Sequence, residues 1–171
     1  MSFDLYFLKR EPGGTWQDAM ERLEEAAADP APLDDTDLAR WDAVRGRVRP
    51  LLPRAEEFTG ESHLELSDAD SGIQLSLSHR ELALTTPYWY SGTDAQAMVD
   101  RLRSVAIAVE TATGLTAYDP QADAAFVSDG DATAAAAFDQ VAAAVRPGAE
   151  RSAHRRAAPG YLLRRIFRRP S

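Results

Sequence analysis

Cysteine is absent from this chain of 171 residues, and its absence excludes several kinds of chemistry. Without cysteine there is no disulfide, no thiolate nucleophile, and no zinc or iron–sulfur site with sulfur ligands. The sequence also lacks a run of about eighteen apolar residues, which an ordinary membrane-spanning helix would need. Asp4 interrupts the apolar residues at the start of the chain, which does not fit a secretory signal. We therefore expect a cytoplasmic protein that is stabilised by packing alone.

Lysine is almost absent too, because Lys9 is the only one, and the arginines that replace it are unevenly distributed. The net charge of the chain is −8, yet residues 151–171 contain seven arginines and no acid, so the preceding residues carry a net −15. A surface that acidic repels nucleic-acid phosphates, and we expect no nucleic-acid partner. It suits either a basic protein partner or simple solubility.

The composition, 44% hydrophobic and 27% charged, is typical of a globular chain, and the length favours one domain. Pro147 and Gly148 have the character of a domain edge. The sequence therefore predicts a single domain over residues 1–148, followed by a basic, arginine-rich tail over residues 149–171.

Hydrophobic periodicity predicts the secondary structure, since alternation indicates strands and a spacing of three or four indicates helices. The expected strands cover residues 3–8, 63–66, 73–78, 82–85 and 115–118. The expected helices begin near Thr15, near Asp35 or Thr36, at Thr93 and at Asp131. Thr15 with Asp18, and Thr93 with Gln96, have the form of capping boxes, and Gly114 is expected to close the third helix in a left-handed conformation.

This order of elements predicts an α+β fold. Residues 68–72 supply turn chemistry between two of the strands, so the strands from His63 to Thr85 should form a meander. We expect a mainly antiparallel sheet of about five strands with helices packed on one face, and specifically a ferredoxin-like arrangement. The alanine-rich segment over residues 131–145 is expected to be a peripheral helix.

The sequence contains no recognisable catalytic or cofactor motif. Asp68, Asp70 and Gly72 resemble the start of a calcium loop, but the glycine comes one position early and the twelfth residue is His79, so we interpret them as turn residues. The aspartates near Asp119 show no fixed ligand pattern, and the histidines have the sequence context of surface residues. We expect no catalytic residue, no cofactor, no metal and no enzymatic activity. The residues weighed here are Asp119, Asp123, Asp129 and Asp131, and His63, His79 and His154.

Tyr88, Trp89 and Tyr90 are the clearest candidates for a binding site. Three consecutive aromatic residues on a short connection cannot all point into one core, and exposed Tyr and Trp commonly anchor partners. The alternative is that Trp89 is buried under a helix while the two tyrosines flank it. The sequence leaves both possibilities open.

The arginine-rich tail has three interpretations. It can be disordered, it can dock on an anionic membrane or a partner as a short amphipathic helix, or it can fold back on the acidic domain. In the docking interpretation, the contact residues would be Arg164, Arg165, Phe167, Arg168 and Arg169.

Two segments resemble a known group of proteins. Residues 1–7 begin Met-Ser-Phe-Asp-Leu, and residues 118–121 form a Tyr-Asp-Pro-Gln turn after the last expected strand. This is similar to small uncharacterised bacterial proteins that open Met-Ser-Tyr-Asp-Leu, some of which look like immunity proteins of toxin systems. The resemblance covers roughly residues 1–121 and implies a binding protein. The expected function is thus to hold a protein partner, and the alternative is a membrane-surface or regulatory role for the tail.

Overall fold

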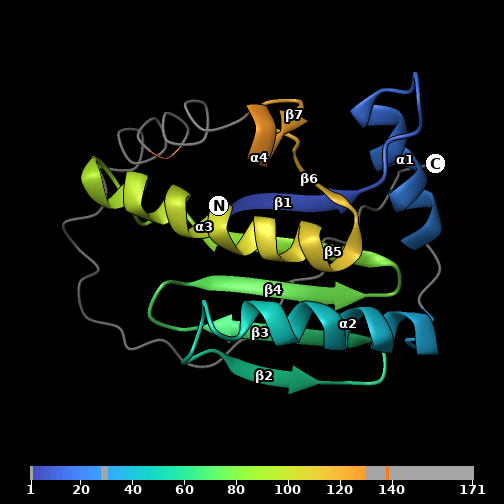
Figure 1. Cartoon of the computed structure of the whole chain (residues 1–171), viewed down its shortest axis with the longest axis horizontal. Helices are drawn as coiled ribbons and strands as arrows, with labels where there is room; N and C mark the ends of the chain where they lie inside the picture. The colour runs from blue at the N-terminus through green and yellow to red at the C-terminus, as the bar shows by residue number, and fades with distance from the viewer. Residues whose placement is uncertain (1, 28–30, 130–137, 139–171) are drawn as a thin grey trace, which may run out of the picture.

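The computed structural model describes residues 2–27, 31–129 and 138 of the chain. These residues form an α+β fold built on one antiparallel sheet (Figure 1). The strands are β1 (Ser2–Leu8), β2 (Glu56–Thr59), β3 (His63–Asp68), β4 (Ile73–Ser78), β5 (Glu81–Pro87), β6 (Thr116–Asp119) and β7 (Ala124–Ala125). The helices are α1 (Trp16–Ala27), α2 (Asp35–Val48), α3 (Thr93–Thr113) and α4 (Phe126–Asp129).

The strand order in the sheet is β2-β3-β4-β5-β1-β6-β7. Strands β3 to β5 form the expected meander, and β2 adds a further antiparallel strand at its edge. Strand β1 then pairs antiparallel with both β5 and β6. Because β1 lies between them, β5 and β6 run parallel to each other, and α3 connects them across the sheet as in a split βαβ unit. The first strand of the chain is therefore an interior strand of the sheet.

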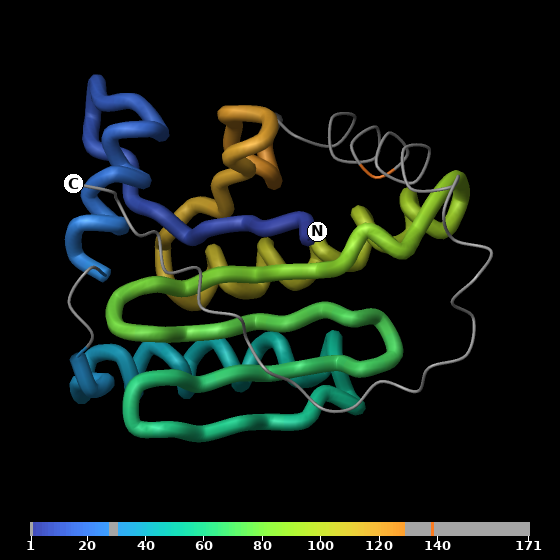
Figure 2. Tube along the Cα trace, turned by 180° about the vertical axis from the view of Figure 1, so that it is seen from behind, coloured from blue at the N-terminus to red at the C-terminus, as the bar shows by residue number. Residues whose placement is uncertain are grey.

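Two helices cover one face of the sheet, whereas α1 lies on the other. Phe3, Leu5 and Phe7 of β1 belong to the core formed with α2 and α3. Leu8 points to the opposite side, where it packs with Ala19 of α1 in a second cluster. Figure 2, from behind, shows the strands of the meander in front of α2, with α1 at one end of the sheet. The prediction of helices on one face was therefore wrong for α1.

The sheet also has more strands than the five expected, since seven form within the described residues. β2 was missed because its four residues are all exposed at the edge of the sheet, so burial imposes no alternation on them. β7 is only two residues long. The ferredoxin-like arrangement is not confirmed, because the meander of four strands and the two helices before it depart from that pattern.

The helix ends follow local hydrogen-bonding chemistry. The capping box of α1 is confirmed, with the Thr15 amide donating to Asp18 Oδ2 at 2.9 Å and the Asp18 amide donating to Thr15 Oγ1 at 3.1 Å. Gly114 ends α3 at φ 69°, as expected. The α2 cap is Asp34, one residue before the earliest expected position, and α3 begins after Gly92 without the side-chain cap expected of Thr93.

A cluster of aromatic rings joins the last described residue to the start of the chain. The Phe138 ring centroid lies 5.3 Å from that of Phe3 and 5.0 Å from that of Tyr88. Phe126 of α4 packs on Phe3 as well, at 5.9 Å. Phe138 is fully buried in the main core, whereas the rest of the helix expected over residues 131–145 lies outside the described residues.

We predict that Phe138→Ala lowers the free energy of unfolding by about 3 kcal/mol, because the truncation leaves a cavity among aromatic rings. Urea unfolding followed by circular dichroism measures this change. Ile107→Ala is the matched control, since Ile107 is 44% exposed on α3, and its effect should stay within about 1 kcal/mol. Equal effects of the two substitutions would show that residue 138 does not belong to the core.

The pKa of Tyr118 is raised to about 12, because burial disfavours the phenolate and the hydroxyl donates to the Asp123 carboxylate at 3.0 Å. The folded state therefore prefers the neutral phenol. This contribution to stability is fully present below pH 10, the usual pKa, and is lost as the pH rises toward 12.

We predict that stability falls less steeply between pH 10 and about 12 in Tyr118→Phe than in the unmodified protein, because the substitution removes the titrating group. Denaturant unfolding at a series of alkaline pH values measures the two slopes. Parallel slopes would contradict the assignment.

Candidate functional site

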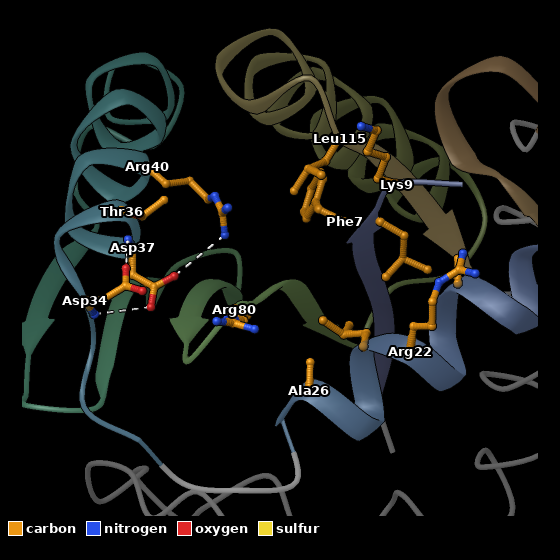
Figure 3. Close-up of a pocket in the computed structure, with 13 residues that line it drawn as sticks. Phe7, Lys9, Arg22, Ala26, Asp34, Thr36, Asp37, Arg40, Arg80 and Leu115 are labelled. Carbon is orange, nitrogen blue, oxygen red and sulfur yellow. Dashed lines mark hydrogen bonds and ion pairs between the residues drawn. The ribbon is translucent and has the colours of Figure 1, made fainter. Parts of the chain in front are cut away.

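An open cleft of about 370 Å³ lies at one end of the sheet. It lies between α1 and the start of α2, beside the end of β1 and the turn that joins β4 to β5 (Figure 3). Its floor is apolar, because Phe7 and Leu8 are only 2% and 3% exposed. Leu23 of α1 and Leu115 after α3 complete the apolar wall.

Four cationic side chains line this cleft, namely Lys9, Arg22, Arg40 and Arg80. Figure 3 shows Arg40 and Arg80 on either side of the gap between α2 and α1, with Lys9 and Arg22 on the side of β1 and α1. Within the part of the chain that the structure describes, Lys9, Arg22 and Arg80 form no ion pair. The cleft therefore concentrates positive charge in a chain whose net charge is −8.

The two acids of the cleft are occupied in capping α2. The Asp37 amide donates to Asp34 Oδ1 at 2.8 Å, and the Asp34 amide donates to Asp37 Oδ2 at 3.4 Å. The backbone N–H of Asp37 lowers the pKa of Asp34. Asp37 is buried, and the nearest nitrogen of Arg40 lies 3.7 Å from its Oδ1, so the guanidinium is not bound tightly.

His79 lies next to this buried carboxylate. Its Nδ1 is 3.6 Å from Asp37 Oδ2, which is too long for a hydrogen bond, and among the described residues this buried nitrogen has no hydrogen-bond partner. The His79 side chain is 19% exposed, so the expectation of a surface histidine was wrong here. Among the described residues His79 Nδ1 has no hydroxyl partner, so this nitrogen does not form the nucleophile–base contact of a hydrolase.

Arg80 occupies a strained backbone conformation. His79 and Arg80 form the two-residue loop between the paired residues Ser78 and Glu81, and Arg80 has a φ of 60°. A side chain in the left-handed region costs roughly 1–2 kcal/mol, which glycine would avoid. The turn thus presents an arginine at the cleft at the expense of stability.

We predict that Arg80→Gly raises the free energy of unfolding by about 0.5–1 kcal/mol, because relief of strain exceeds the entropic cost of glycine. Arg80→Ala is the control: it removes the same guanidinium but retains the Cβ atom that causes the strain. Urea unfolding of the three proteins measures the difference. If the glycine variant were no more stable than the alanine variant, the turn would carry no strain.

The predicted aromatic segment lies at the opposite end of β5. Trp89 is 72% exposed, whereas Tyr88 and Tyr90 pack partly against the main core. Tyr88 donates a hydrogen bond to Gln121, and Tyr90 donates one to the Ser71 carbonyl at 2.9 Å. Because β5 is seven residues long, about 23 Å of strand separates this segment from the turn at the cleft. The structure therefore does not bring the two features together.

Trp89 rests on a close-packed support. A Cβ atom added to Gly72 would lie 2.8 Å from the Pro87 ring and 3.1 Å from Trp89 Cζ3, so the indole lies against the backbone at Gly72. Gly72 has a φ of +67° in the turn between β3 and β4. We define the Trp89 surface as Pro87 to Tyr90 together with Ser71 and Gly72.

Four carboxylates act electrostatically on the two tyrosines of the Trp89 surface. Burial raises the pKa of Tyr88, and the charges of Asp119 and Asp4 raise it further. Burial likewise raises the pKa of Tyr90; Arg101 opposes this effect, whereas Asp68 and Asp94 add to it. The aromatic segment is therefore set in a mainly acidic environment.

The remaining sequence candidates have structural roles or lie outside the described residues. Asp68 is buried, accepts a hydrogen bond from Ser71 and lies 3.4 Å from Arg101, which agrees with a turn. Asp119 accepts hydrogen bonds from the amides of Gln121 and Ala122 in the turn after β6. The described ranges contain no cluster of three or more residues that could hold a metal. The tail residues Arg164, Arg165, Phe167, Arg168 and Arg169 lie outside the described residues.

Sequence patterns missed the cleft because its lining is scattered between residues 7 and 115. Each cation has an ordinary local context at a strand end, in a helix or in a turn. The one available signal was Arg80, which occupies a two-residue hairpin loop where glycine or asparagine is usual.

Comparison with protein-family models, curated proteins and solved structures finds no match for this chain. Among the residues that the structure describes, no helix combines the length and the apolarity needed to cross a bilayer.

Proposed function

We propose that this chain is a cytoplasmic, non-catalytic binding protein that holds a basic protein partner on the Trp89 surface, as an immunity protein holds its toxin. The observation that carries this proposal is the exposure of Trp89, at 72%. Trp is the residue type most enriched among binding hot spots, because it buries a large area at little entropic cost. The resemblance expected from the sequence of residues 1–7 and 118–121 implies the same function.

The support beneath Trp89 is suited to binding. The flanking tyrosines are tied to Gln121 and to the Ser71 carbonyl, and the indole lies against Gly72. Trp89 therefore requires little further ordering when a partner covers it, and such preorganisation improves affinity. An exposed indole on a mobile loop would lose more conformational entropy on binding, which would weaken affinity.

Charge determines the kind of partner. Asp4 and Asp119 act electrostatically on Tyr88, Asp94 acts on Tyr90, and the chain has an excess of acid. A partner with a basic surface would be attracted over distances up to the Debye length, about 8 Å at physiological salt. Association should consequently become slower as salt is added.

The alternative function, docking of the basic tail on an anionic membrane, stays a prediction from the sequence because residues 149–171 lie outside the described residues.

We predict that Trp89→Ala weakens the complex by about 2 kcal/mol or more, roughly a thirtyfold rise in Kd. The partner is first isolated on the immobilised protein and identified by mass spectrometry, and its affinity is then measured with purified proteins by calorimetry at two salt concentrations. Phe58→Ala is the matched control, because Phe58 is also exposed, at 59%, but lies on β2 at the sheet edge. Unchanged affinity in Trp89→Ala, or a complex insensitive to salt, would contradict the proposal.

A further inference from the structure

We propose that the cleft beside Arg80 binds a small molecule that carries a phosphate monoester on an apolar body. This site is separate from the Trp89 surface and does not depend on the partner proposed there. Its lining contains four cationic and two anionic side chains, so it has an excess of two positive charges. A phosphate monoester, with a charge of about −1.5 to −2 at neutral pH, balances that excess.

The positive charge of the cleft is unusual in this chain. The sequence has 27 acidic and 19 basic residues, so carboxylates are plentiful. Elsewhere in the described structure several arginines use them: Arg45 and Arg49 both bind Glu57, and Arg101 contacts Asp68. In the cleft, by contrast, Lys9, Arg22 and Arg80 have no ion pair among the described residues. Their donors are therefore available to an external anion.

The guanidinium groups of Arg40 and Arg80 are placed to bind one oxyanion together. Arg40 comes from α2 and Arg80 from the turn after β4, and Figure 3 shows them projecting into the same gap. Arg40 lies 3.7 Å from Asp37, so its donors are not consumed by that contact. Guanidinium donors match phosphate oxygens in a bidentate geometry, which a single ammonium group cannot provide.

The apolar wall explains why the ligand should be larger than inorganic phosphate. Phe7, Leu8 and Ala19 form a buried floor, and Leu23 and Leu115 stand beside it. The volume of about 370 Å³ lies in the range of small-molecule sites. With the phosphate at the cationic rim, an attached ring or aliphatic group would cover this apolar surface.

The strained turn supports the same assignment. Arg80 is held at φ 60°, where glycine would be favoured. Its charge lowers the pKa of Asp34, but Arg80 forms no ion pair with a carboxylate in the described structure. Strain of this kind is concentrated at binding sites, because selection for the ligand contact maintains it. The turn is thus accounted for if Arg80 contacts a ligand.

The experiment titrates the full chain with phenyl phosphate at pH 7.5, using calorimetry for the affinity and amide chemical shifts for the location. Benzoate, inorganic phosphate and benzyl alcohol are titrated in parallel, to vary the anion, remove the ring and remove the charge. The variants are Arg40→Ala and Arg80→Gly. The control is Arg47→Ala. Arg47 is an exposed arginine of α2, like Arg40, but it does not line the cleft.

We expect phenyl phosphate to shift the amides of residues 7–9, 34–40 and 79–81, and to bind more tightly than the three comparison compounds. Arg40→Ala and Arg80→Gly should each raise its Kd about tenfold or more, whereas Arg47→Ala and Trp89→Ala should leave it unchanged. Because the turn strain predicts a glycine variant more stable than the unmodified protein, lost binding in Arg80→Gly would not reflect unfolding.

Any one of five results would overturn the proposal. If phenyl phosphate did not bind at millimolar concentration, or if it bound equally well to Arg40→Ala, the cleft would not be a phosphate-monoester site. Benzoate binding as tightly as phenyl phosphate would contradict the phosphate assignment. Inorganic phosphate or benzyl alcohol binding equally well would show that only the charge or only the ring is recognised.

Discussion

The placement of β1 between β5 and β6 is the constraint on which the rest of the structure depends. An interior strand of a sheet buries both of its faces when helices cover the sheet on both sides. In β1, Phe3, Leu5 and Phe7 face α2 and α3, while Leu8 faces α1. The first strand, together with β6, therefore contributes residues to both clusters and joins them.

The cleft is a consequence of this two-sided arrangement. Since α1 and α2 follow β1 in sequence but belong to different faces of the sheet, they diverge at the end of β1. The gap between them is floored by Phe7 and Leu8, which are buried by the two clusters. Arg80 from the β4–β5 turn and Arg40 from α2 reach its rim, where both side chains meet solvent. Apolar floor and cationic rim thus have one structural origin.

The Trp89 surface and the cleft illustrate different relations between stability and function. At the Trp89 surface the tyrosines serve both purposes, because each buries part of its ring in the core while holding the exposed indole in place. At the cleft, Arg80 contributes strain and no ion pair within the described structure. The first surface can be understood partly from folding, whereas the strain at Arg80 is accompanied by no closer interaction in the described structure than its longer-range attraction to Asp34.

The sequence by itself determined the local elements: the meander, the stripe of Met98, Leu102, Val105 and Val109 in α3, and the helix ends at Thr15 and Gly114. These depend on contacts between residues close in the chain, which periodicity records. It also singled out the segment that contains Trp89, although not which ring is exposed. Only the tertiary structure decided the edge strand β2, the second face covered by α1, and the cleft. Both the pairing of the exposed strand β2 and the lining of the cleft by Lys9, Arg40 and Arg80 depend on contacts between residues far apart in the chain. Such contacts produce no periodicity in the sequence.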